Sequence, residues 1–206
     1  MKYKIHLVPI IFFLLILAYF VLVRARPLEV GTISNSFAVA ATIVIGLCFI
    51  TGPLSRLKPH FVHLLKYRKP LGLWGFAFAA IHAGAALILN LDTITSAENI
   101  ISTISAVIAF VIFLAMALTS RVKYIKSMGY EKWKKLQRTG YIAFFFVLLH
   151  FTLINNMAFV NRQIGQLLFA FALFVLLLRM LVILLGKREA YKPEEFHEVH
   201  EIEPAR

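Results

Sequence analysis

Six long apolar stretches, separated by short polar breaks, make up most of the chain. They run at about 5–23, 36–54, 71–90, 99–119, 139–160 and 163–185. Each has close to the roughly 20 residues that an α-helix needs to cross the hydrocarbon of a bilayer. The pattern therefore predicts an all-α integral membrane protein, a six-transmembrane-helix bundle. No internal repeat is apparent in it.

Composition narrows the class of protein further. Of the 206 residues, 60% are hydrophobic and 16% are charged, and the mean hydropathy is +0.80. These values are far from those of a soluble domain. We expect one transmembrane domain over 1–186, followed by a charged cytoplasmic tail over 187–206. His197 and His200 in this tail have a spacing that allows metal binding, but also simple solvation.

The formal net charge of +12 predicts an orientation and not a nucleic-acid partner, because the basic residues lie between spans. The loops after the second and fourth spans hold most of them: Arg56, Lys58, Lys66, Arg68, Lys69, Arg121, Lys123, Lys126, Lys132, Lys134, Lys135 and Arg138. Basic loops remain cytoplasmic. We therefore expect both termini in the cytoplasm and the basic residues near lipid headgroups.

Two histidines, His82 and His150, are the only ones placed well inside spans, since His6 lies near the membrane edge of the first span. Each lies twelve residues past the cytoplasmic start of its span, at Pro70 and at Arg138, so both reach about 18 Å into the membrane. Ionisable residues in hydrocarbon are costly and point to function. Two level imidazoles on helices that run in the same direction can ligate both faces of a heme iron. The alternatives are hydrogen bonds between helices, a histidine-only metal site or a proton relay.

Other residues change this interpretation little. The single cysteine, Cys48, lies in an apolar run, so any redox chemistry requires a bound cofactor. The third span is rich in small residues, including Gly72, Gly75 and Gly84, which would let a flat macrocycle approach. Small residues serve ordinary helix packing as well.

Three stretches resemble a known family: TGPLSR (51–56), RKPLGLWGFAFAAIH (68–82) and WKKLQRTGY (133–141), the last followed by Leu149-His150. They are similar to the ferric-reductase-like transmembrane family, in particular to the heme-binding membrane subunits of bacterial periplasmic methionine sulfoxide reductase systems. The resemblance implies a b-type heme protein of the bacterial inner membrane. Such a protein carries electrons from a cytoplasmic reductant to a periplasmic acceptor, which is a molybdenum enzyme in the methionine sulfoxide case.

Many relatives in this family hold a second heme through another histidine on each of the same two helices, thirteen or fourteen residues earlier. This chain has Arg68 or Lys69 at one of these positions and Gln137 at the other. Because an amide is a poor axial ligand for heme iron, we predict one heme b, bound by His82 and His150.

Three arginines are candidates for binding a second anionic group near the cytoplasmic side. Arg68, Arg138 and Arg179 can pair with heme propionates or with the phosphate of FMN. Arg68 and Arg138 are equally suited to anchoring the topology. Arg179 lies within an apolar run, so it either extends to the interface or has a buried anionic partner.

The sequence thus predicts an electron-transfer subunit of an oxidoreductase system, with no catalytic residues of its own. Its donor would be a cytoplasmic flavin reductase or a membrane quinol, and its acceptor a periplasmic molybdoenzyme or another periplasmic redox protein. One alternative is a stand-alone transmembrane ferric or metal reductase. The other is a non-redox transporter or scaffold in which the histidines only join helices.

Overall fold

The computed structural model describes residues 4–186, which are entirely helical or in connecting loops. Six stretches are long and apolar enough to cross a membrane. They comprise α1 (Lys4–Ala18) with the π-helix η1 (Tyr19–Val23), α2 (Val30–Leu57), the 3-10 helix η2 (Pro59–Tyr67) with α3 (Arg68–Leu89), α5 (Ile100–Leu118), α7 (Tyr130–Arg138) with α8 (Gly140–Leu153), and α9 (Gln163–Leu184). The expected multi-pass membrane protein is confirmed. The tail at 187–206 lies outside the described residues.

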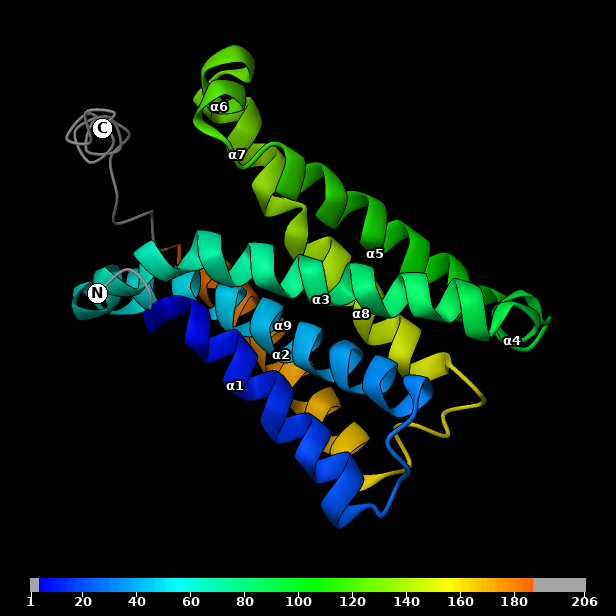
Figure 1. The fold of residues 1–206 in the computed structure, drawn as a ribbon. Coiled ribbons are helices and arrows are strands. Elements are labelled where there is room, and N and C mark those ends of the chain that lie inside the picture. Colours follow the sequence, from blue (N-terminus) through cyan, green and yellow to red (C-terminus); the bar gives the residue numbers. More distant parts are fainter. Residues whose placement is uncertain (1–3, 187–206) are drawn as a thin grey trace, which may run out of the picture.

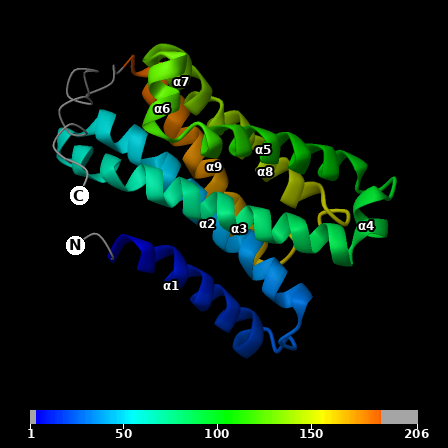
Figure 2. The ribbon, with the colours of Figure 1, turned by 45° about the horizontal axis from the view of Figure 1, so that its top comes forward.

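The helices run alternately between two ends of the bundle (Figures 1 and 2). One end carries η2 and the short helices α6 (Val122–Met128) and α7, and we call it the basic end. The opposite end carries α4 (Leu91–Thr95) and the loop at 154–162. The hairpin of α6 and α7 projects beyond the other helices at the basic end (Figure 1).

Helix α2 forms the centre of the bundle, because it packs on α1, α3, α8 and α9. Its buried residues include Val39, Ala40, Val44 and Phe49. The first turns of α2 are polar, which is why the hydropathy pattern placed its start near residue 36. The hydroxyls there have different partners: Ser36 Oγ donates to the Thr32 carbonyl at 2.8 Å, Ser34 Oγ lies 3.0 Å from the His82 Nδ1, and the buried Thr32 Oγ1 has no hydrogen-bond partner among the described residues. The span nevertheless begins six residues earlier, at Val30.

The fifth span ends earlier than predicted, at Leu153 instead of residue 160. Asn155, Asn156 and Met157 then take left-handed conformations, with φ of 49°, 52° and 64°, and asparagine tolerates such angles better than most residues. Asn99 holds this turn: its Oδ1 accepts from the Asn155 backbone N–H at 2.7 Å, and its Nδ2 donates to the Asn155 Oδ1 at 3.2 Å. The apolar residues at 158–160 belong to the loop.

Candidate functional site

His82 lies on α3 toward the opposite end of the bundle, where its imidazole faces the first turns of α2. Its Nδ1 is 3.1 Å from the Ser34 carbonyl oxygen and 3.0 Å from the Ser34 Oγ. Both contacts involve the same ring nitrogen. The Nε2 atom is left on the far side of the ring, directed away from α2.

His150 on α8 repeats this arrangement against α5. Its Nδ1 is 3.1 Å from the Ser102 carbonyl oxygen and 3.0 Å from the Ser102 Oγ. The Ser102 hydroxyl also contacts the carbonyl oxygen of His150 at 3.0 Å. Each histidine is therefore fixed by one serine, through one ring nitrogen, from one neighbouring helix.

The two arrangements reveal an internal repeat that the hydropathy pattern did not show. In both cases the serine precedes its histidine by 48 residues. A shift of 68 positions along the sequence aligns residue 34 with residue 102 and residue 82 with residue 150. The same shift aligns further identical residues: Ala38 with Ala106, Thr51 with Thr119, Gly72 with Gly140, Phe76 with Phe144 and Phe78 with Phe146. The expectation of no internal repeat was wrong. The repeat lies in the equal spacing of matching residues, which the hydropathy pattern does not show.

Packing separates the two histidine helices. Helix α3 packs mainly on α2, and α8 mainly on α5, whereas α3 and α8 are not among the closely packed pairs. Helix α5 nevertheless packs against both of them. Both histidine side chains are only half-buried. The structure thus places His82 and His150 on two helices that share α5 as a neighbour.

This donor set suits a group that takes two nitrogen ligands from the protein. Each histidine has Nδ1 engaged and Nε2 available, as a metal-ligating histidine normally does. Within residues 4–186, no three His, Cys, Asp or Glu side chains gather into a metal-binding group. A heme iron needs only two axial ligands from the protein. The described residues therefore fit a heme better than a histidine-only metal site.

The three glycines of α3 differ in how much space surrounds them. A Cβ on Gly75 would collide with the Ile45 side chain, and one on Gly72 would lie 3.5 Å from the Cys48 Sγ. Close packing of α2 on α3 therefore requires glycine at 75, whereas a Cβ at 72 would make only an ordinary contact. A Cβ on Gly84 would meet nothing within 4 Å. Helix packing therefore explains Gly75 but not Gly84, beside which there is open space.

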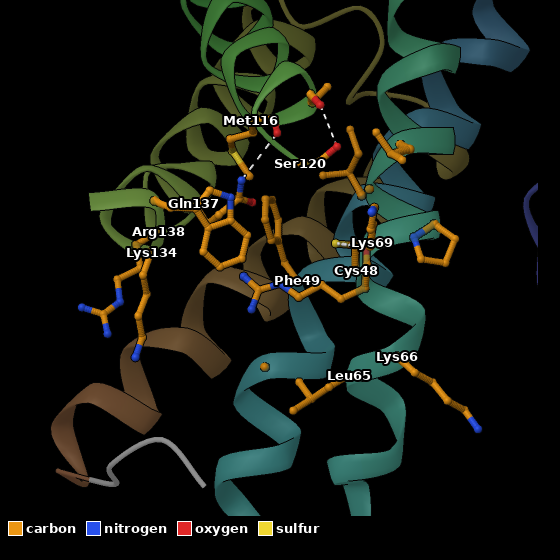
Figure 3. A pocket seen from close by; sticks show the side chains of 18 of the residues that line it. Cys48, Phe49, Leu65, Lys66, Lys69, Met116, Ser120, Lys134, Gln137 and Arg138 are labelled. Carbon is orange, nitrogen blue, oxygen red and sulfur yellow. Dashed lines mark hydrogen bonds between the residues drawn. The ribbon is translucent and has the colours of Figure 1, made fainter. Parts of the chain in front are cut away.

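A cavity of about 640 Å³ lies at the basic end (Figure 3). In Figure 3, Lys134, Gln137 and Arg138 lie on one side of it, and Cys48 and Lys69 lie on the other. Seven cationic side chains line it: Arg56, Lys66, Arg68, Lys69, Lys134, Arg138 and Arg179. No carboxylate of the described residues does so. The cavity thus combines a strongly positive lining with apolar walls.

Tyr141 lines this cavity and contacts residues of α2 and α9. Its hydroxyl donates to the Phe49 carbonyl at 2.8 Å, and its ring stacks on the Phe49 ring with centroids 4.8 Å apart. The Arg179 guanidinium lies 5.1 Å from the centre of the Tyr141 ring. Arg179 therefore points into the bundle as a cation–π partner, and it reaches the same cavity as Arg68 and Arg138.

Gln137 and Cys48 also line the cavity, but neither is placed as a strong ligand. The Gln137 amide donates to the Met116 carbonyl at 3.5 Å, and the Cys48 thiol donates to the Arg68 carbonyl at 3.1 Å. Both side chains are thus occupied by the helices around them. The position where relatives were expected to carry a histidine joins α7 to α5 in this chain.

The fold defines a multi-pass helical membrane protein with two serine-backed histidines inside its bundle. Residues 9–149 match the family model described as ferric reductase like transmembrane component. The chain belongs to this family. The match includes His82 and ends one residue before His150.

Curated relatives agree with this assignment. The chain is 30% identical to the protein-methionine-sulfoxide reductase heme-binding subunit MsrQ of Azospira oryzae over 157 residues, 72% of this chain and 65% of that protein. It is also 34% identical to the magnetosome protein MamZ of Magnetospirillum gryphiswaldense and of Paramagnetospirillum magneticum. Those matches cover 98 residues, 45% of this chain and 15% of each relative. The chain thus spans less than two thirds of each of these relatives.

Proposed function

We propose that this protein is a b-type heme electron-transfer subunit of the bacterial inner membrane, with His82 and His150 as the axial ligands of one heme. The observation that carries the proposal is the pair of serine-backed imidazoles inside the bundle, each engaged through Nδ1, so that Nε2 remains for ligation. A heme bound there supplies one-electron chemistry between ferric and ferrous iron. The MsrQ relative, which is named as a heme-binding subunit, supports this assignment.

The side chains around the histidines would hold the heme and limit its chemistry. Ser34 and Ser102 orient the two rings, and occupation of both axial positions leaves no open site for a substrate at the iron. Electron transfer, and not oxygen chemistry, is the reaction that such a site favours.

The cavity at the basic end is the proposed entry point for electrons. We assign this end to the cytoplasm because its loops are rich in lysine and arginine. Arg68 and Arg179 would bind the phosphate of FMN, either resident or carried by a flavin reductase, while the apolar walls receive the ring. A membrane quinol is the alternative donor. Arg138, which is exposed at the rim, would interact with the same anions or with lipid headgroups.

The opposite end would deliver electrons to a periplasmic oxidoreductase. His82 lies in the outer part of α3, and His150 lies three residues before α8 ends. This placement favours an acceptor that docks on the periplasmic face. By similarity to MsrQ, we propose a methionine sulfoxide reductase, of the molybdenum-dependent type, as this acceptor.

An absorption spectrum of the purified protein tests the assignment. We expect one heme per chain with bis-histidine bands, lost or strongly altered in His82→Ala and in His150→Ala. His60→Ala is the matched control, because His60 is exposed on η2 at the basic end. A wild-type protein without a Soret band, or histidine variants with unchanged bands, would refute the assignment and favour a transporter or scaffold.

The family assignment also favours a second candidate, a stand-alone ferric reductase. In that case the reduced protein itself would pass electrons to a chelated ferric ion at the periplasmic face. Mixing the reduced protein with ferric chelate, and separately with an oxidised periplasmic reductase, distinguishes the two. Rapid reoxidation by the chelate alone would favour the ferric reductase.

A further inference from the structure

The hydrogen bonds around both histidines dictate which ring nitrogen carries the proton. A backbone carbonyl oxygen can only accept a hydrogen bond. The Nδ1 atoms of His82 and His150 each lie 3.1 Å from a serine carbonyl oxygen. Each Nδ1 must therefore be the protonated nitrogen, and each Nε2 keeps its lone pair.

The Ser102 hydroxyl strengthens this conclusion. Its own hydrogen is directed to the His150 carbonyl oxygen, 3.0 Å away. Its oxygen, 3.0 Å from the His150 Nδ1, then has only lone pairs to offer that ring. The Ser102 hydroxyl is therefore a second acceptor for the Nδ1 proton.

Ser34 occupies the equivalent position toward His82, at the same distance of 3.0 Å. Both serines are buried, and both lie within the first turns of helices that begin at the opposite end of the bundle. Bulk water therefore does not compete with either serine for the Nδ1 atom of its histidine.

From this geometry we infer that Ser34 and Ser102 are a matched pair of positioning residues, which orient both axial histidines and lower the reduction potential of the heme. The inference rests on the proposed heme function. An acceptor at Nδ1–H makes Nε2 a stronger electron donor, and stronger donation stabilises ferric over ferrous iron. Because the halves are equivalent, the two serines act in the same direction and by similar amounts.

Redox titration of Ser34→Ala, Ser102→Ala and the double variant tests this role. We expect each single variant to keep one heme per chain and to raise the equilibrium constant for heme reduction about two- to tenfold, the range of one ordinary hydrogen bond. The double variant should show the product of the two factors. Ser34→Thr and Ser102→Thr retain the hydroxyl and should restore the wild-type potential.

Two neighbouring serines provide controls for the loss of a buried hydroxyl. Ser36 Oγ donates to the Thr32 carbonyl and Ser105 Oγ to the Ile101 carbonyl, so neither hydroxyl donates to a histidine. Ser36→Ala and Ser105→Ala should leave the potential unchanged. An unchanged potential in Ser34→Ala and Ser102→Ala, or an equal shift in the controls, would overturn the inference.

A second measurement separates this inference from the heme proposal. ¹⁵N spectra of labelled histidine in the protein without heme report the tautomer directly, and we expect the Nδ1–H form for His82 and His150. Absence of heme from the wild type would refute the proposed function alone. The Nε2–H form at both residues would refute the role of the serines, whatever the protein binds.

Discussion

Arg179 shows how a charge is accommodated within an apolar helix. It lies over the Tyr141 ring and faces the cavity at the basic end. We expect Arg179→Gln to weaken FMN binding about ten- to a hundredfold, the effect of losing a charged hydrogen-bond partner. Titration of the detergent-solubilised protein with FMN, followed by quenching of flavin fluorescence, measures this change.

The control for this prediction is Arg162→Gln. Arg162 is exposed next to the start of α9 at the opposite end, so its loss changes the net charge equally but leaves the cavity intact. Equal FMN affinity in Arg179→Gln and the wild type would contradict the assignment of the cavity to an anionic ligand.

Tyr141 offers a prediction that separates its hydroxyl from its ring. Tyr141→Phe removes only the hydrogen bond to the Phe49 carbonyl and should cost about 0.5–1.5 kcal/mol of stability, with FMN affinity retained. Tyr141→Leu also removes the aromatic surface under Arg179 and should weaken FMN binding. Thermal unfolding and the same fluorescence titration measure the two effects. If both variants bind FMN like the wild type, the ring does not position Arg179.

The candidate histidines were predictable from the sequence, but the serines that hold them were not. An ionisable residue inside an apolar run is visible at once, because its environment follows from its neighbours in the chain. Ser34 and Ser102 lie 48 residues from their partners and resemble ordinary hydroxyls in membrane helices. Only the packing of α2 on α3 and of α5 on α8 identifies them.

At the scale of helices, close packing of α2 on α3 depends on Gly75. A Cβ at this position would collide with the Ile45 side chain and lie 3.2 Å from the Ile45 backbone nitrogen. We expect Gly75→Ala to destabilise the protein by about 1–3 kcal/mol, as overpacking of a core does. A thiol-reactive dye can follow unfolding, since Cys48, the single cysteine, is buried in the folded protein.

Gly84→Ala is the comparison on the same helix. Its Cβ would meet no atom within 4 Å, so the melting temperature should remain the same or rise slightly, because alanine favours helix. If both variants melted alike, the α2–α3 interface would be adaptable, and the requirement for a small residue at 75 would be disproved.

The number of spans could be predicted from the hydropathy pattern, whereas the start of α2, the end of α8 and the repeat could not. Hydropathy averages over a window, so the hydroxyl-rich start of α2 looked like a loop and the apolar loop at 158–160 looked like helix. The Ser36 hydroxyl donates to a carbonyl of its own helix, and the left-handed turn at Asn155 follows the end of α8. Both depend on local hydrogen bonding that a hydropathy pattern does not contain.

At the scale of the whole molecule, the two ends of the bundle differ in charge and in content. The cationic cavity occupies the basic end, while the histidines lie toward the opposite end. Each half of the repeat contributes one histidine, whereas Arg179 of the cavity comes from α9, outside the repeat. This polarity suits a protein that receives electrons on one side of a membrane and releases them on the other.

Single new cysteines test that polarity in intact cells. Ser127 is exposed at the basic end, whereas Ala97 and Asn161 are exposed at the opposite end. With a membrane-impermeant maleimide, Ala97→Cys and Asn161→Cys should react in spheroplasts, and Ser127→Cys should react only after the membrane is opened. The wild type supplies the blank, since Cys48 is buried. The reverse labelling pattern would place the cavity outside the cell, where no cytoplasmic donor can reach it.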